Sequence, residues 1–140
     1  MKSNFKAIQR QWTQGRSKEE QERYNLIIEK SKTCPFCNLE APDGNAILQD
    51  YVDESEASNG MYVLRNLFPY ERWDSREVKS HLLLVPSRHI LKFEEFTPRE
   101  TVAYYNLIRK FDAKGYSSLT RAVSNPGKSV EHFHTHLIVV

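Results

Sequence analysis

Residues 132–140 read His-Phe-His-Thr-His-Leu-Ile-Val-Val, so three of the chain's five histidines stand in one short run. The apolar and β-branched residues that end the run favour a buried strand. Because side chains alternate faces along a strand, His132, His134 and His136 are expected to share one face while the residues between them point to a core. We therefore predict a row of imidazole rings spaced about 6–7 Å apart.

The row has three chemical interpretations. The rings can be structural histidines, although clustered imidazoles are costly to bury without hydrogen-bond partners. They can together bind a metal ion, as imidazoles from one strand do in zinc enzymes. They can also carry out nucleophilic catalysis, in which the central ring attacks and its neighbours orient and bind the substrate.

Four segments, in this order along the chain, resemble the histidine triad (HIT) superfamily. They are Cys34-Pro-Phe-Cys37, Asn66-Leu-Phe-Pro-Tyr70, His81-Leu-Leu-Leu-Val-Pro-Ser-Arg-His89, and the stretch from Gly127 to Ile138. The last segment contains the signature His-x-His-x-His followed by two apolar residues, with Thr135 as its one soft departure. The resemblance covers the chain from about residue 34 onward and leaves residues 1–33 outside it.

The resemblance implies an enzyme, a hydrolase or nucleotidyltransferase acting on the α-phosphate of a nucleotide conjugate. Nucleoside phosphoramidates, dinucleoside polyphosphates and adenylylated compounds are the substrates it suggests. His134 matches the family's nucleophile, which becomes nucleotidylated, and His136 matches the ring that binds the phosphate oxygens. The scheme requires no catalytic metal. Relatives commonly pair as homodimers, so a homodimer is expected.

Two other functions stay open at this point. Residues 66–70 are also reminiscent of dinucleoside polyphosphate phosphorylases, which would use phosphate in place of water. A rival of a different class is a nucleotide-binding module with little catalysis, working with a protein partner through its N-terminal arm.

The turn before the triad offers phosphate-binding chemistry. Gly127 lets an anion approach the backbone closely, and Lys128 adds positive charge. The hydroxyl of Ser129 can donate to the oxygen of a leaving group. Asn125 can donate to a phosphate or simply form the turn. In relatives the position of Asn66 holds the ribose hydroxyls, whereas its alternative role is to end a strand.

Cys34 and Cys37 are the only cysteines, so a disulfide framework is excluded. Such a pair can be redox-active, two plain thiols, a disulfide, or part of a metal site. In the HIT branches that carry Cys-x-x-Cys, the matching partners here are His89 and His132. The resemblance thus implies a closed structural zinc site with two cysteine and two histidine ligands.

Residue patterns along the chain predict an α+β fold. We expect strands at 46–52, 61–66, 81–86 and 116–123 and through the triad, helices at 18–31 and 98–114, and a loop at 70–80. Capping boxes at Ser17 and Thr97 start the helices. The expected result is a HIT-like antiparallel sheet with one long helix over residues 34–140, preceded by a helical extension, residues 1–33, that docks on the sheet or contacts a partner.

The amino-acid composition indicates which class of protein this is. Hydrophobic residues make up 39% of the chain and charged residues 27%, typical of one globular domain. A net charge of +2 is too small to indicate nucleic-acid binding. No apolar run approaches the ~20 residues of a membrane span, and no apolar signal core follows the N-terminus, so we expect a cytoplasmic protein.

Overall fold

The computed structural model describes residues 15–30, 34–37, 50–128 and 130–140. A five-stranded sheet forms its centre, with the order β1-β2-β5-β7-β6 and antiparallel pairing throughout. The strands are β1 (Tyr51–Asp53), β2 (Met61–Arg65), β5 (Ser80–Pro86), β6 (Ser117–Leu119) and β7 (Thr135–Val139). The predicted α+β architecture with an antiparallel sheet is confirmed.

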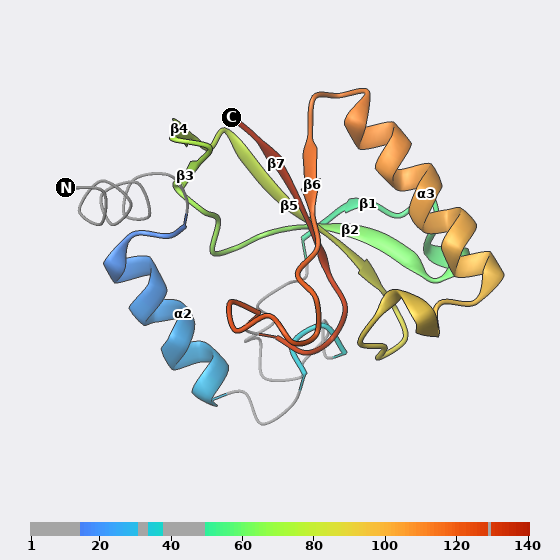
Figure 1. Ribbon diagram of the computed structural model, residues 1–140, viewed down its shortest axis with the longest axis horizontal. Coiled ribbons are helices and arrows are strands. Elements are labelled where there is room, and N and C mark those ends of the chain that lie inside the picture. The colour runs from blue at the N-terminus through green and yellow to red at the C-terminus, as the bar shows by residue number, and fades with distance from the viewer. Residues whose placement is uncertain (1–14, 31–33, 38–49, 129) are drawn as a thin grey trace.

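Helix α3 (Pro98–Asp112) lies along the sheet, and α2 (Lys18–Lys30) lies on the opposite side of the molecule (Figure 1). Both start where the sequence predicts. Thr97 accepts a hydrogen bond from the Glu100 amide and its own amide donates to the Glu100 side chain, which completes a capping box. At α2, Ser17 accepts from the Glu20 amide. Short 3-10 turns, η1 (Ala57–Asn59) and η2 (Phe93–Glu95), occupy connections.

Apolar side chains cover both faces of the sheet. Between the sheet and α3 lies a cluster of buried side chains from both elements: Met61, Val63, Leu82, Leu84, Ala103, Leu107, Phe111 and Leu137. The other face carries Phe36, Tyr62, Leu64, Leu83, Val85 and Val130. Because neighbouring residues of β5 are buried on opposite faces, this strand has the continuous apolar character that the sequence shows. β5, which pairs with β7, is therefore packed against apolar side chains on both faces.

The triad does not lie wholly on a strand. β7 begins at Thr135, so the prediction that one strand carries all three rings is wrong for His132 and His134. The amide of Phe133 donates instead to the carbonyl of Ile90 at 2.7 Å, and this bond ties the segment before β7 to the chain that follows β5. Side chains nevertheless alternate, since Phe133 packs on aromatic rings of the α3 side while His134 contacts Phe36 on the other face.

Residues 70–80 are not a simple loop, so that prediction is also wrong. Strands β3 (Arg72–Trp73) and β4 (Arg76–Glu77) form a small hairpin. Its turn places Asp74 and Ser75 at φ 51° and 60°, the left-handed conformations of a type I′ turn. Such turns usually carry Asn and Gly, and their absence here explains why residues 70–80 show no hairpin pattern in the sequence. Gly15 extends the hairpin by pairing with Arg72.

Other boundaries are shorter than predicted. The strand expected at 116–123 covers only Ser117–Leu119, and the strand expected at 46–52 is seen as Tyr51–Asp53, with 46–49 outside the described residues. Residue 31 of the first predicted helix also lies outside them. Leu26, one of its apolar positions, is 56% exposed. Residues before α2 contact the segment after β2, where Arg16 donates to the Phe68 carbonyl at 2.6 Å.

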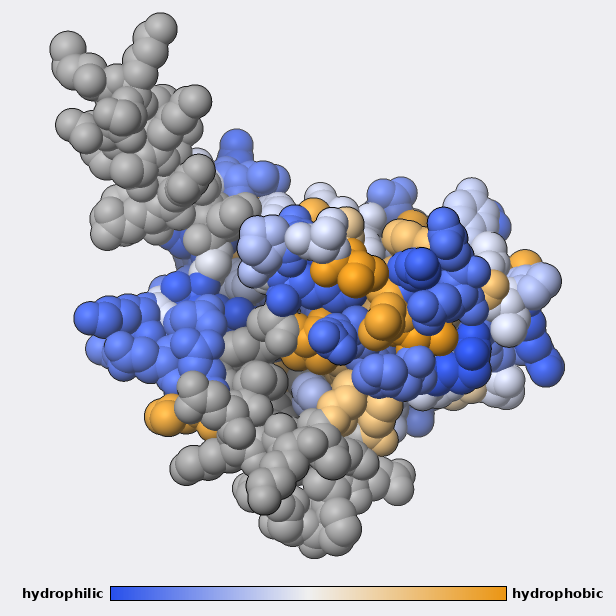
Figure 2. Space-filling model, turned by 60° about the horizontal axis from the view of Figure 1, so that its bottom comes forward, coloured by the Kyte–Doolittle hydropathy of each residue, from blue (hydrophilic) through white to orange (hydrophobic). Residues whose placement is uncertain are grey.

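The surface in Figure 2 is mostly hydrophilic, with apolar residues gathered in patches among charged ones. Val102 and Tyr105 of α3 are among the large apolar side chains that remain exposed. Within the described part of the chain, no helix is long and apolar enough to cross a membrane.

Arg88 and Glu100 join the end of β5 to the start of α3. The guanidinium donates to both carboxylate oxygens at 2.8 and 2.9 Å, and the Glu100 side chain is 5% exposed. These bonds from Arg88, with further ones from Thr97, outweigh burial and lower the pKa of Glu100 to about 2. The pair also fixes the residue next to His89.

We expect Glu100→Gln to lower the free energy of unfolding by about 1–2 kcal/mol at pH 7, since Arg88 is half-exposed and solvent weakens the pair. Glutamine preserves the capping box, so the change isolates the charge. A lowered pKa gives stability that is complete above the unfolded value near 4.5 and is lost as the pH falls toward 2. Denaturant titrations at pH 7, 4 and 2.5 should show the difference from wild type shrinking. The exposed Glu94→Gln is the matched control, and a difference that does not change with pH would contradict the assignment.

Candidate functional site

All five histidines of the chain lie along the β5–β7 pair, from His81 at the start of β5 to His89 beyond its end. β7 runs antiparallel to β5 and places His136 opposite Leu83. The bond between Phe133 and Ile90 holds the segment with His132 and His134 against the chain that follows β5. The rings divide into a group with cysteines and a group with tyrosine and arginine.

The first group is Cys34, Cys37, His89 and His132, whose ligand atoms all lie within 4.8 Å of one another. The Nδ1 atom of His132 is 3.5 Å from each cysteine Sγ and 3.2 Å from Nδ1 of His89, which is itself 3.2 Å from the Cys37 Sγ. Ligands around a tetrahedral zinc ion stand about 3.3–3.8 Å apart, as the usual bond lengths require. These residues therefore fit a metal ion such as zinc, and the cysteines are free thiols.

The orientation of His132 supports that fit. Its Nε2 lies 2.8 Å from the carbonyl of Pro86, which can only accept a proton, so Nε2 carries the hydrogen. The lone pair is then on Nδ1, directed at the two sulfur atoms. A carbonyl that fixes the tautomer of a ligand in this way is typical of metal-binding histidines.

His134 is the central ring and is 7% exposed. Its Nδ1 lies 2.9 Å from the carbonyl of His132, which places the proton on Nδ1 and the lone pair on Nε2. No hydrogen bond to this Nε2 is found from the described residues. Burial is the largest of the effects that lower the pKa of His134 to about 4, so the ring is neutral near pH 7.

His136 belongs to a hydrogen-bonded chain that begins at a backbone amide. The amide of Tyr70 donates to Nδ1 of His81 at 3.0 Å, so the proton of His81 is on Nε2. That Nε2 is 2.8 Å from Nδ1 of His136 and donates to it, which leaves the proton of His136 on its own Nε2. Burial lowers the pKa of His81 to about 3 and holds that of His136 well below its usual range. His136 is thus a neutral hydrogen-bond donor.

His81 and Arg121 were not among the predicted site residues. His81 opens a segment that the family resemblance includes, but nothing in a strand of apolar residues assigns its ring a partner. Arg121 lies where a strand was expected, and its Nη1 is 3.1 Å from Nε2 of His136. Only the tertiary structure joins these two residues to the triad.

The turn before the triad is formed partly by its own side chains. Asn125 accepts a hydrogen bond from the Gly127 amide at 2.7 Å, the arrangement of a turn-forming residue. Lys128 donates to the carbonyl of Leu91 at 3.3 Å and is partly buried, and burial lowers its pKa. Ser129, predicted to act on the leaving group, lies outside the described residues.

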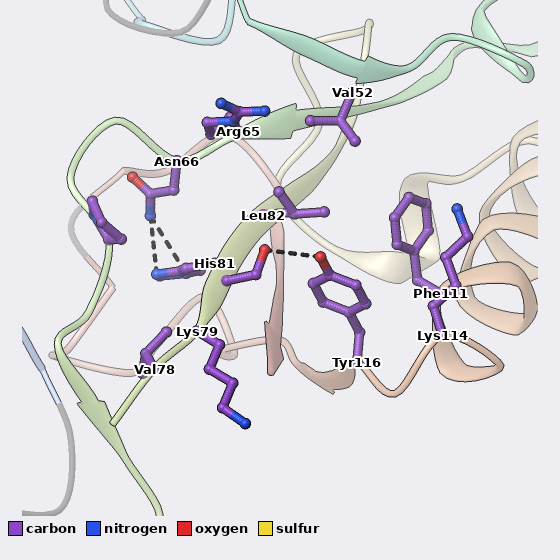
Figure 3. Close-up of a pocket in the computed structure, with 12 residues that line it drawn as sticks. Val52, Arg65, Asn66, Val78, Lys79, His81, Leu82, Phe111, Lys114 and Tyr116 are labelled. Carbon is purple, nitrogen blue, oxygen red and sulfur yellow. Dashed lines mark hydrogen bonds between the residues drawn. The ribbon is translucent and has the colours of Figure 1, made fainter. Parts of the chain in front are cut away.

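Asn66 lies at one end of a pocket of about 440 Å³, shown in Figure 3. Its carbonyl oxygen accepts from the Phe68 amide at 2.8 Å, and its amide nitrogen lies over the ring of His81 at 3.4 Å. Asn66 therefore ends β2 as a turn residue in this structure. The volume suits a small ligand. The residues that line the pocket include Asn66 and His81 but neither His134 nor His136.

The three triad rings do not converge on one point. His132 faces the cysteines, Nδ1 of His134 is bonded to the backbone, and Nε2 of His136 faces an arginine that would repel a cation. The interpretation of the triad as a single metal site therefore has no geometric support. The arrangement presents the unprotonated Nε2 of His134 beside His136, which is a neutral hydrogen-bond donor.

Comparisons with known proteins agree with this fold. No family model matches the chain. The protein hit of Bacillus subtilis (strain 168) is 31% identical over 72 residues, which are 46% of this chain and 50% of that protein, so the match spans about half of the relative's length.

Solved structures extend the likeness. A member of the HIT family from Bacillus subtilis is 26% identical, with a TM-score of 0.54 and coverage of 77% of this chain and 72% of its own. The histidine triad nucleotide-binding protein from Candida albicans is 18% identical, with a TM-score of 0.56 and coverage of 75% and 73%. A HIT family hydrolase from Clostridium thermocellum is 20% identical, with a TM-score of 0.50 and coverage of 76% and 89%. The chain therefore has the fold of HIT family proteins, and these likenesses support its place in the HIT superfamily.

Proposed function

We propose that this protein is a HIT-type nucleotidyl hydrolase or transferase that attacks the α-phosphate of a nucleotide conjugate with His134. The observation that carries the proposal is the bond from Nδ1 of His134 to the carbonyl of His132, because it leaves Nε2 unprotonated. A neutral imidazole with a fixed tautomer is a competent nucleophile at neutral pH. The names of the similar structures, a nucleotide-binding protein and a hydrolase, are consistent with it.

The first step forms a bond between Nε2 of His134 and the α-phosphorus while the bond from phosphorus to the leaving group breaks. The ring becomes a cation in the intermediate, and the carbonyl of His132 stabilises the proton that stays on Nδ1. The Nε2–H of His136 donates to a phosphate oxygen and stabilises the charge that develops there. The hydroxyl of Ser129 is expected to donate a hydrogen bond to the leaving-group atom, and the proton that the leaving group takes up comes from solvent.

Water resolves the intermediate in the second step. It attacks the α-phosphorus, the phosphorus–nitrogen bond breaks, and the products are a nucleoside monophosphate, a proton and the original neutral ring. Gly127 lets the phosphate approach the backbone of the turn, the charge of Lys128 helps to hold it, and Asn66 contacts the ribose. Phosphate in place of water would make the same site a phosphorylase.

The cluster of Cys34, Cys37, His89 and His132 binds a structural zinc ion in this proposal. With these four protein ligands, a bound zinc ion would link the segment at 34–37 to the chain on both sides of the site and would supply no catalytic step. The same ligands would hold His132, whose carbonyl orients His134. The four residues would thus affect catalysis through position alone.

Trapping the intermediate tests the function. Incubation with an adenosine phosphoramidate or a diadenosine polyphosphate labelled at the α-phosphate, followed by rapid alkaline denaturation, should leave label on the protein. Phosphohistidine is labile to acid and stable to base, so acid should release the label. Product analysis with and without added phosphate separates hydrolysis from phosphorolysis. Turnover with no labelled protein under single-turnover conditions would argue for direct attack by water.

A further inference from the structure

Arg121 projects from the segment after β6 to the edge of the histidine cluster. Its Nη1 donates to the hydroxyl of Tyr70 at 2.8 Å and lies 3.1 Å from Nε2 of His136. The side chain is half-buried, and no carboxylate forms an ion pair with it within the described residues. Among the described residues, this cation therefore has no counter-charge at the site.

The contact between Arg121 and His136 brings two donors together. Arginine can only donate, and the chain of bonds from the Tyr70 amide through His81 leaves a proton on Nε2 of His136. These two N–H groups face each other, and no acceptor between them comes from the part of the chain that the structure describes. An oxygen atom of an anion placed between them would accept from both, and the geometry therefore has the donor pattern of an anion site.

A second guanidinium comes from the N-terminal extension. Arg16 is anchored to the carbonyl of Phe68, and its central carbon is 5.0 Å from the centre of the Tyr70 ring. The corresponding atom of Arg121 is 5.8 Å from the same ring. The two side chains therefore border one aromatic ring that stacks beside His136 at 5.4 Å. After burial, both guanidinium groups contribute to the low pKa of His81 and His136.

Gly127 leaves room for Arg121. A Cβ atom at this position would come within 3.3 Å of the arginine Nε and 3.1 Å of the Asn125 side chain. The phosphate-binding turn and the guanidinium are thus neighbours, and a side chain at residue 127 would press on both.

We propose that Arg121 and Arg16 form an anion subsite that binds a phosphate group of the leaving group and favours substrates whose leaving group carries one. The proposal rests on the proposed function, because it takes His134 as the nucleophile. In that function the Nε2–H of His136 serves an α-phosphate oxygen, and the guanidinium of Arg121, 3.1 Å from this nitrogen, reaches the phosphate group bonded next to the α-phosphate. The extension would then supply a specificity-determining residue to the site.

The test compares two substrates with the same adenylyl group. Adenosine phosphoramidate releases ammonia, which carries no phosphate, whereas attack on the α-phosphate of diadenosine tetraphosphate releases adenosine triphosphate. We expect Arg121→Gln to lower kcat/KM for the tetraphosphate by about 10- to 100-fold and Arg16→Gln by about 10-fold, with the phosphoramidate changed less than about 3-fold. Arg121→Lys, which keeps the charge but not the planar donor pair, should give an intermediate loss. Arg109→Gln on α3 is the matched control.

Each outcome decides the question. An equal loss with both substrates would overturn the subsite, because Arg121 would then serve the α-phosphate. If the wild type turns over neither substrate, the proposed function fails, and calorimetric titration with inorganic pyrophosphate judges the subsite separately. Binding that is lost in Arg121→Gln and kept in Arg109→Gln upholds it, and binding that is unchanged in Arg121→Gln, or absent from the wild type, overturns it. Thermal unfolding of each variant shows whether a loss reflects misfolding.

Discussion

Replacement of His134 by alanine is expected to lower kcat/KM for a nucleotide conjugate by about 10⁴- to 10⁶-fold, the scale found when a nucleophile is removed. The reason is that His134 alone combines a lone pair on Nε2 with a proton held on Nδ1 by the carbonyl of His132. His132 and His136 cannot replace it, since one faces the cysteines and the other has its Nε2 proton directed at Arg121. Initial rates with a fluorogenic phosphoramidate measure the effect.

Two controls make this result specific. His134→Ala should keep the fold and the metal, so its thermal unfolding and metal content should match those of the wild type. Imidazole added to the variant should restore part of the turnover, because the deletion leaves space for the missing ring. A variant that keeps a tenth or more of wild-type activity would remove His134 from the mechanism.

Loss of the metal site is expected to have the largest effect on stability. We expect Cys34→Ser to lower the metal content from about one zinc per chain to below a tenth and to lower Tm by about 10–20 °C. A metal bound at a thousandfold excess over its Kd contributes about 4 kcal/mol, and a domain of this size loses several degrees per kcal/mol. Without the metal, the segment at 34–37 would be held by packing such as that of Phe36.

Elemental analysis and calorimetry on the same samples measure both quantities. His89→Ala should behave like Cys34→Ser, although the two ligands lie far apart in the sequence, and a chelator should reproduce the effect in the wild type. His134→Ala is the matched control, because it removes a histidine of the triad that lies outside the group. Zinc retained in Cys34→Ser, or lost in His134→Ala, would assign the metal to other residues.

Local sequence was sufficient for much of the fold. The continuous apolar run of β5 predicted a strand buried on both faces, and the capping box at Thr97 located the start of α3. The hairpin at 72–77 was not predicted because Asp74 and Ser75 are uncommon residues for its turn. The start of β7 was predicted too early, because the amide of Phe133 bonds to Ile90, far away in the sequence, and not to a neighbouring strand of the sheet.

The sequence by itself identified the candidate functional residues of this protein, namely the histidines of the triad, the cysteine pair and the glycine turn, from their spacing and from the resemblance to the HIT superfamily. Tertiary structure decided what each ring does. It separates His132 from its neighbours by turning it to the cysteines, links His136 to His81, and brings Arg16 and Arg121 to the same tyrosine. The physical reason is that the proton on an imidazole is placed by its hydrogen-bond partner, and those partners come from segments that meet only when the sheet has formed.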